Sequence, residues 1–302
     1  MRIPSSFVAV LMAGAALSAC AAPAALEGSG PVAAFDAARI AEDIRVLSDD
    51  SFEGRGIATP AEQKVIDYLS RQYAAAGFQP GGPNGQWTQD VILNRFTQSN
   101  VQAALKLGDW TLPMTQGREV ALSTRRPAEH VSLKDAPLVF VGYGITAPER
   151  NWDDFKGQDL RGKVLVVLVN DADFEEPALN TFGGKAMTYY GRWTYKYEEA
   201  GRQGAAGAII IHDTEPASYG WNVVESSWSG PQAYASRGDN PPPMTQVNGW
   251  VQKSVAERLF AAAGKDFGEL TAAAREEEVE ERGAQAAEVQ GACRRWREAD
   301  AH

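Results

Sequence analysis

The stretch 153–174 reads DDFKGQDLRGKVLVVLVNDADF: a turn-rich segment, six consecutive apolar residues, and then two closely spaced carboxylates. A short, wholly apolar run between turn residues is typical of a strand buried on both faces of a parallel sheet. Two other runs have this character, PLVFVGYGI at 137–145 and AAGAIIIHD at 205–213. Between 174 and 205, RWTYKYEEAGRQGA at 192–205 predicts a helix ending at Gly204. Strand, helix and strand in this order predict a parallel pair with a right-handed crossover, so the fold class is α/β.

Asp171 and Asp173 follow the central apolar run, and two interpretations are open for them. Open α/β sheets often bind ligands at the carboxyl ends of their strands, which would make the two carboxylates part of a site. Alternatively, Asn170 and Asp171 end the strand, and their side chains accept hydrogen bonds from nearby backbone amides. We favour the second interpretation, in which the stretch is scaffolding.

Helices are predicted on the amino-terminal side of these strands. Apolar residues from Phe35 to Leu47 recur at helical spacing. A second helix begins with unusual clarity, because Thr59 and Glu62 form a capping-box pattern and Pro60 takes the first helical position. It is expected to run to about Ala76, with Gly77 ending it and with one buried stripe, which consists of Val65, Tyr68, Leu69 and Tyr73.

Strands are expected next at WTQDVIL, 87–93, and at VQAALKLGDWTL, 101–112, the latter folding as a hairpin at Gly108 and Asp109. Beyond Ile211 the chain looks rich in loops, and after 250 an amphipathic helix is interrupted by Gly264. Residues 275–302 contain no Leu, Ile or Phe, so we expect this tail to be disordered.

The first twenty residues have the pattern of an export signal, with Arg2, an apolar run from Phe7 to Leu17 and small residues at the end. The ending LSAC resembles the bacterial lipoprotein signal, which implies lipidation of Cys20 and a lipid-anchored protein of the periplasm or outer membrane. Residues 21–34 then form a flexible tether. Because Cys293 is the only other cysteine, no internal disulfide is expected.

Composition and motifs limit the functions that the chain can have. Its 302 residues carry 39 acidic against 29 basic side chains, and a net charge of −10 argues against a nucleic-acid partner. GYGITA at 142–147 has the spacing of a dinucleotide-binding loop. Such a loop must lead into a helix, and no amphipathic helix follows here, so we do not predict a dinucleotide site. The sequence contains neither a GxSxG elbow nor a phosphate-binding GxxxxGK[ST] loop.

His130, His212 and His302 lack the spacing of zinc ligands, and the first two read as surface residues. We therefore assign no catalytic residue and no metal ligand.

Two parts of the sequence together resemble a known family. LSDDSFEGRGIATPAEQKVIDYLSRQYAAAGFQP at 47–80 resembles the opening of bacterial exported zinc aminopeptidases. FVGYGITAPERNWDDFKGQDLRGKVLVVLVNDADF at 140–174, with EEAGRQGAAGAIIIHD at 198–213, is similar to the protease-associated (PA) domain inserted in those enzymes. The resemblance extends from about Phe35 to Leu270 and implies a di-zinc peptidase-like α/β domain carrying a β-rich inserted domain.

The resemblance also implies what the chain lacks. In the family, two zinc ions and a glutamate base hydrolyse peptides, and the ligands begin with an HxDH-like motif after the inserted domain; this chain has no such motif. We therefore expect an incomplete peptidase-like domain, with no cofactor in this chain, and a tail that is truncated or frameshifted. The expected divisions are 1–20 signal peptide, 21–34 tether, 35–130 peptidase-like part, 131–250 PA domain, 251–274 returning helix and 275–302 tail.

Three functional hypotheses follow. The chain is the amino-terminal fragment of an exported zinc aminopeptidase, inactive alone, whose substrate or partner is a peptide or protein and whose only membrane contact is the anchor at Cys20. Alternatively it is a noncatalytic peptide- or protein-binding module, like relatives that resemble the transferrin receptor, presenting a loop with Trp221 and Trp228. Thirdly, a separate chain completes the site.

Overall fold

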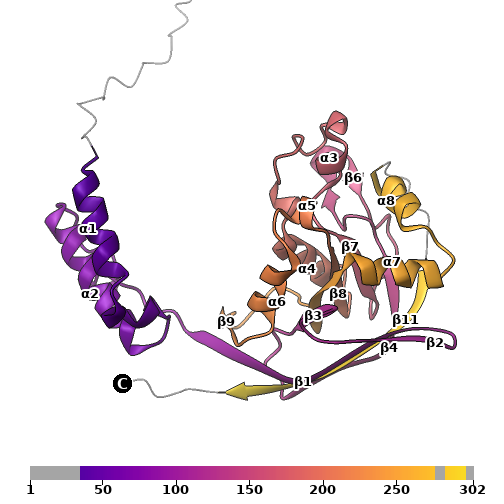
Figure 1. Ribbon diagram of the computed structural model, residues 1–302, viewed down its shortest axis with the longest axis horizontal. Coiled ribbons are helices and arrows are strands. Elements are labelled where there is room, and N and C mark those ends of the chain that lie inside the picture. The colour runs from indigo at the N-terminus through magenta and orange to yellow at the C-terminus, as the bar shows by residue number, and fades with distance from the viewer. Residues whose placement is uncertain (1–34, 276–282, 297–302) are drawn as a thin grey trace, which may run out of the picture. The chain divides into compact units, whose positions relative to one another are not determined.

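The computed structural model describes residues 35–275 and 283–296 (Figure 1). The predictions for the signal segment, Cys20 and the tether lie outside these residues. Internal contacts divide the chain into two units, Met1–Gln89 and Asp90–His302. None of the helices within the described ranges has the length and apolar content of a membrane span.

The described part of the first unit is helical. Its elements are α1 (Ala37–Leu47), the 3-10 helix η1 (Asp50–Arg55), α2 (Pro60–Ala75) and the 3-10 helix η2 (Pro83–Gly85). The Asp36 carboxylate caps α1 by accepting hydrogen bonds from the amides of Ala38 and Arg39, at 2.9 and 3.2 Å. The start of α2 at Pro60 is confirmed, and Gly77 beyond its end has a left-handed φ of 88°.

Two details predicted for α2 are wrong. The Thr59 side chain does not cap the helix; its hydroxyl donates to the Gly56 carbonyl oxygen, and Glu62 accepts from the Ala58 amide rather than from Thr59. Of the predicted buried stripe only Tyr68 is buried, whereas Leu69 and Tyr73 are 38% and 51% exposed. Helical spacing identifies an apolar face, but it does not supply the element that would cover that face.

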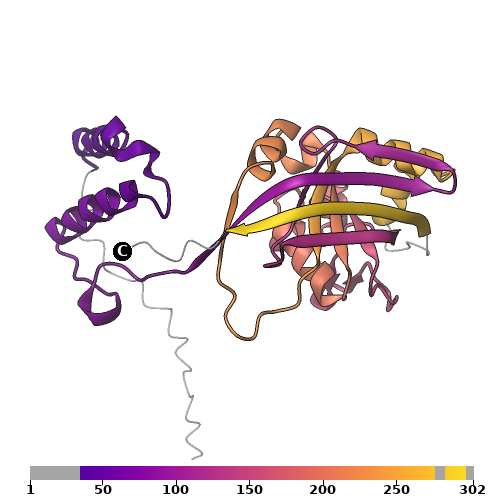
Figure 2. The same ribbon diagram turned by 90° about the horizontal axis from the view of Figure 1, so that it is seen from below.

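The second unit is built on one mixed sheet of nine strands among the described residues (Figures 1 and 2). Its order is β2-β1-β11-β4-β7-β8-β10-β3, and β9 also pairs with β1. The strands are β1 (Leu93–Leu107), β2 (Trp110–Met114), β3 (Val120–Ser123), β4 (His130–Phe140), β7 (Val164–Leu168), β8 (Gly207–His212), β9 (Gln232–Ala235), β10 (Val247–Gln252) and β11 (Gly283–Trp296).

The middle of the sheet confirms the predicted α/β class. Strands β4, β7, β8 and β10 are parallel neighbours, and α4 (Trp193–Arg202) connects β7 to β8. Every residue of β7 is buried, with Val166 packed in one core cluster and Val167 in the other. A strand buried on both faces has no polar side, which explains its continuous apolar sequence.

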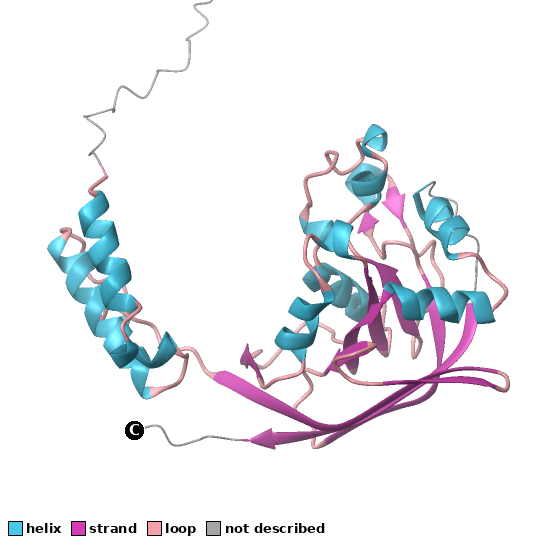
Figure 3. Ribbon diagram, viewed as in Figure 1, coloured by secondary structure: helices cyan, strands magenta, loops and turns pink. Residues whose placement is uncertain are grey.

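Helices cover both faces of these parallel strands (Figure 3). On one face lie α7 (Lys253–Ala262) and α8 (Phe267–Arg275), which contribute Leu259, Phe260 and Leu270 to the core. On the other lie α4 and α6 (Trp221–Trp228), which contribute Tyr197 and Val224. Connecting segments hold the two-stranded sheet of β5 (Thr146–Ala147) and β6 (Trp152–Asp153), and the short helices η3 (Pro148–Arg150), α3 (Ala172–Glu175), η4 (Pro177–Leu179), η5 (Tyr189–Gly191) and α5 (Thr214–Ala217).

Several boundaries differ from the sequence-based expectation. The strand expected at 87–93 begins only at Leu93 and continues without a break to Leu107, although the hairpin turn at 108–109 is confirmed. The division between the units falls after Gln89, earlier than the boundary expected between 130 and 131. The physical reason is that β1, β2 and β3 pair into the same sheet as the later strands.

The prediction of a disordered tail is wrong for residues 283–296. These residues form β11, which pairs antiparallel with β1 on one side and with β4 on the other. A strand bonded on both sides satisfies its backbone groups through its neighbours, so it does not need large apolar residues of its own to be placed in a sheet. Residues 276–282 and 297–302 lie outside the described part.

Candidate functional site

A cleft of about 560 Å³ lies where the parallel strands β7 and β8 end. Leu168, Ile211 and Phe267 give it apolar walls. Its charged lining comes from α3, α7, α8 and the segments beside them, and comprises the cations Lys253, Lys265 and Arg275 and the carboxylates Glu175, Asp213, Glu257 and Asp266. The volume is in the range of small-molecule sites, and carboxyl ends of parallel strands are where open α/β sheets bind ligands.

Two ion pairs connect elements around this cleft. Lys253 Nζ lies 2.6 Å from Asp213 Oδ2, and these side chains are 44% and 33% exposed. The hydrogen bond that Lys253 donates to the Asp213 carboxylate raises the pKa of Lys253, so the ammonium stays charged at neutral pH. Arg275 Nη1, at the end of α8, lies 2.8 Å from Glu175 Oε2 in α3. Both cations therefore already have an internal carboxylate partner.

Tyr143 is a buried polar residue in the segment that follows β4. Its side chain is 1% exposed, and its hydroxyl has no hydrogen-bond partner among the described residues. Burial raises the Tyr143 pKa well above its usual value; Glu175 raises it further and Arg275 lowers it. An unpaired buried hydroxyl is unfavourable, and such groups often mark a place where water or a ligand bonds.

The segment that carries Tyr143 is fixed by close backbone contacts. Gly142 and Gly144 on either side have left-handed φ values of 59° and 63°. The Leu168 amide donates to the Gly142 carbonyl oxygen over 2.8 Å, and the Ile145 amide donates to Asp154 Oδ2 over 2.9 Å. The sequence GYGITA thus forms a tight turn into β5, and no α-helix begins there.

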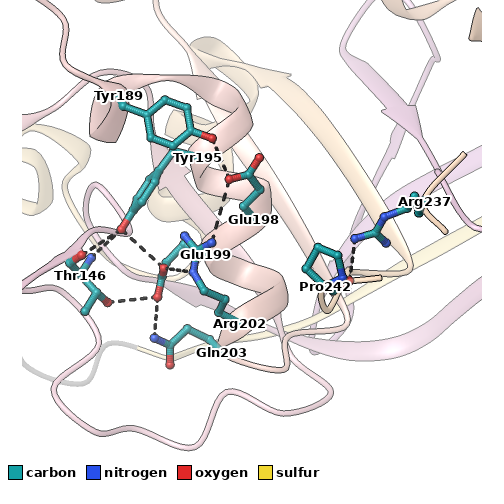
Figure 4. A network of polar contacts seen from close by, with 9 residues as sticks. All are labelled: Thr146, Tyr189, Tyr195, Glu198, Glu199, Arg202, Gln203, Arg237 and Pro242. Atoms are coloured by element: carbon teal, nitrogen blue, oxygen red, sulfur yellow. Dashed lines mark hydrogen bonds and ion pairs between the residues drawn. The ribbon is translucent and has the colours of Figure 1, made fainter. Parts of the chain in front are cut away.

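A polar network then ties this turn to α4 (Figure 4). The Tyr195 hydroxyl accepts from the Thr146 amide over 3.0 Å and donates to the Thr146 carbonyl oxygen over 3.1 Å. The Glu199 carboxylate, only 5% exposed, accepts from the Thr146 hydroxyl, from Arg202 Nε at 2.7 Å and from Gln203 Nε2 at 2.8 Å. Because the carboxylate of Glu199 is fully engaged, we assign this network a structural role.

Buried charges lie beside the same strand ends. Lys196 is 1% exposed and donates from Nζ to the Asn170 carbonyl oxygen over 2.8 Å. Burial lowers the Lys196 pKa to about 7, an effect that Asp154 and Asp171 oppose. Burial likewise raises the Asp154 pKa to about 7 and raises the pKa of Asp171. The sequence offered no signal for this cluster, because a lysine in a polar helical segment looks like a surface residue.

The two carboxylates of the opening stretch have different surroundings. Asp173 is fully buried and accepts from three backbone amides, those of Thr181, Phe182 and Gly184, at 3.1, 2.7 and 2.9 Å. The scaffolding interpretation is confirmed for this residue. Asp171 has fewer partners: its Oδ2 accepts from the Thr188 hydroxyl over 3.2 Å, and its buried Oδ1 has no partner within the described part of the chain.

The histidines and tryptophans are placed differently from expectation. His130 is exposed at the start of β4, but His212 is 4% exposed, not a surface residue, and its Nε2 lies 3.1 Å from the Tyr219 carbonyl oxygen. Trp221 and Trp228 lie at the two ends of α6 rather than in a loop, and they pack against the core. Trp221 Nε1 donates to the Gly117 carbonyl oxygen over 2.7 Å, so its polar edge is engaged.

The described residues do not fit a di-zinc centre. Over the ranges 35–275 and 283–296, no three His, Cys, Asp or Glu side chains gather as a metal site requires. Of the two carboxylates in the opening stretch, Asp173 accepts hydrogen bonds from backbone amides and is not free to bind a metal ion. We derive no chemical step through zinc for this chain.

Comparisons with known proteins give a limited result. No family model and no curated protein matches the chain. Among solved structures, an aminopeptidase from Aneurinibacillus sp. strain AM-1 aligns at 19% identity with a TM-score of 0.32, covering 78% of this chain and 42% of that one. A zinc aminopeptidase from Bacillus subtilis aligns at 14% identity with a TM-score of 0.29, covering 79% and 39%. The chain thus spans about two fifths of the length of these structures, and likenesses at such TM-scores support no conclusion about activity.

Proposed function

We propose that this chain is the noncatalytic, peptide-binding part of an exported protein of the zinc aminopeptidase type, and that its second unit corresponds to the inserted PA domain. The observation that supports peptide binding is the cleft at the ends of β7 and β8. A peptide presents charged ends, a polar backbone and apolar side chains, and the cleft offers both signs of charge beside apolar walls. The sequence resemblance at 47–80, 140–174 and 198–213 supports the peptidase context.

The proposal assigns hydrolysis to residues that this chain does not contain. Full-length chain supplied with zinc is expected to give no turnover of aminoacyl-nitroanilides. It is expected to bind unmodified short peptides with one site per chain, measured by isothermal titration calorimetry. Zinc-dependent turnover, or two tightly bound zinc ions per chain, would contradict the noncatalytic assignment. Absence of peptide binding would contradict the binding role.

Export and anchoring are part of the same proposal. Lipidation of Cys20 would place the protein on a bacterial membrane while the folded units remain in the exported compartment. Replacing Cys20→Ser is expected to move the protein from the membrane fraction to the supernatant after cell lysis. A membrane fraction unchanged by the replacement would remove the lipid anchor from the account.

A further inference from the structure

The sequence contains two Asn–Gly dipeptides, Asn84–Gly85 and Asn248–Gly249. An asparagine before glycine is chemically labile, because glycine has no side chain to keep its backbone nitrogen away from the asparagine side chain. The two dipeptides have opposite surroundings: Asn84 and Gly85 are exposed, whereas Asn248 and Gly249 are buried in β10. The same local chemistry is therefore present in an open and in a closed environment.

Asn84 lies in the short 3-10 helix η2, which has no buried residue. A Cβ placed on Gly85 would have no atom within 4 Å, so the surroundings of the dipeptide are open. The Gly85 amide donates only one long hydrogen bond, 3.3 Å to the Gly82 carbonyl oxygen. Opening a turn without buried contacts costs little free energy, so the Gly85 nitrogen is readily released to react.

The fold closes off the second dipeptide. Asn248 is 6% exposed, and its Oδ1 accepts a hydrogen bond from the Thr245 hydroxyl. Gly249 pairs with Ile209 of β8 on one side and with Leu122 of β3 on the other. A Cβ on Gly249 would lie 2.4 Å from Leu122 Cδ2, so this part of the sheet is closely packed. Reaction at Asn248 requires the core sheet to open first.

We propose that Asn84 is a site of spontaneous deamidation and that the fold selects it over Asn248. The Gly85 nitrogen loses its proton and bonds to Asn84 Cγ, while the bond from Cγ to Nδ2 breaks and ammonia leaves. Water then opens the resulting succinimide ring at either carbonyl, which gives aspartate or isoaspartate. Water is the only co-reactant, and no atom is oxidised or reduced.

The product changes a turn that precedes Trp87. The Gly82 amide donates to the Gln86 carbonyl oxygen over 2.8 Å, and a Cβ on Gly82 would lie 2.6 Å from the same oxygen, so the turn is tightly closed. Isoaspartate adds a methylene group to the backbone inside this turn, together with a carboxylate. Trp87 stacks on Tyr73 of α2, with ring centroids 6.4 Å apart. The modification is therefore expected to loosen the contact between Trp87 and α2.

The test is to incubate the full-length chain at mildly alkaline pH, which favours loss of the amide proton, and to map its peptides by mass spectrometry. Replacement of NH₂ by OH changes the mass, and chromatography separates aspartate from isoaspartate. We expect Asn84 to convert at least about a hundredfold faster than Asn248, because opening a core strand costs up to the global unfolding free energy.

Asn180 is the matched control within the same chain. It is exposed, and its φ of 50° is close to the 56° of Asn84. It precedes Thr181, whose β-branched side chain hinders attack by the backbone nitrogen. We expect little conversion there. In urea, Asn248 is expected to convert as fast as Asn84, while Asn180 stays slow.

Equal rates at Asn84 and Asn248 in the folded chain, or conversion of Asn84 only in urea, would overturn the inference. Conversion of Asn180 as fast as Asn84 would overturn the role given to glycine. Asn84→Gln is expected to abolish the product at this position. Hydrogen–deuterium exchange around Tyr73 should be faster in the aged wild type than in aged Asn84→Gln, and equal exchange would overturn the predicted effect on α2.

Discussion

Lys196 and Asp154 are ionisable groups of opposite charge type inside the protein, and burial drives each toward its neutral form. Lys196 contacts the Asn170 carbonyl oxygen after β7, whereas Asp154 holds the Ile145 amide in the turn after β4. The pair thus fixes the strand ends from which the cleft is built. Buried charges of this kind stabilise one arrangement more than they stabilise the fold as a whole.

Asp154 gives the protein a pH-dependent stability. The pKa of Asp154 is about 7 in the folded state, whereas an exposed aspartate has a pKa near 3.8. Between pH 3.8 and pH 7, the folded state therefore holds a proton on Asp154 that the unfolded state has lost. Stability contributed by this group is complete below pH 3.8 and is lost as the pH rises to 7. We expect Asp154→Asn to gain at least about 1 kcal/mol of unfolding free energy relative to the wild type between pH 4 and 7. Urea denaturation at several pH values measures this, and a constant difference would refute the raised pKa.

Asp173 illustrates a carboxylate with a structural role. Asp173→Ala leaves the amides of Thr181, Phe182 and Gly184 without their acceptor. We expect a loss of about 2–4 kcal/mol of unfolding free energy, since unpaired buried amides are costly. Thermal unfolding checks this against Asp159→Ala, an exposed carboxylate for which little change is expected. Similar unfolding temperatures for the two variants would mean that the Asp173 bonds do not stabilise the loop.

At the scale of elements, strong local patterns predicted structure well. The apolar run 164–169 became a strand buried on both faces, 192–205 became α4 with Gly204 beyond its end, and Gly264 separates α7 from α8. Local sequence patterns did not predict elements whose extent depends on pairing with distant strands. The extent of β1 and the presence of β11 follow from pairing with strands far away in sequence, which no local window contains.

The candidate site was predictable only in its location. The interpretation that the sequence analysis did not favour placed a site after the apolar strand, at Asp171 and Asp173, and the cleft lies at this edge of the sheet. The residues that line the cleft could not be foreseen, because Glu175, Lys253 and Arg275 come from the separate elements α3, α7 and α8. Their proximity depends on how α7 and α8 pack against the sheet, and helical periodicity does not fix this packing.

The turn between β4 and β5 is sensitive to substitution at Gly144. A Cβ at Gly144 would lie 2.9 Å from Val167 Cγ1, and the φ of 63° is itself unfavourable for alanine. Gly144→Ala is expected to cost about 2–4 kcal/mol of unfolding free energy, combining backbone strain with overlap. Gly157→Ala is the matched control, since Gly157 has a φ of 73° and open space around it, and strain alone should cost about 1–2 kcal/mol. Equal losses in urea denaturation would show that Val167 makes room.

At the scale of the whole molecule, two units share the described chain and carry different features. The first unit contains helices α1 and α2 with several exposed apolar side chains, such as Ile44 and Tyr73. The second unit contains the sheet, both core clusters and the cleft. The proposed binding role therefore belongs to the second unit, and it requires no metal from the residues described.

The central claim is that a peptide binds in the cleft at the carboxyl ends of β7 and β8. Hydrogen–deuterium exchange of the full-length chain, with and without a saturating short peptide, tests it most directly. We expect the peptide to slow amide exchange in 168–176, 211–217 and 253–275, the segments that form the cleft, and to leave α1 and α2 unchanged. Unchanged exchange in those three segments, or protection confined to α1 and α2, would contradict the account.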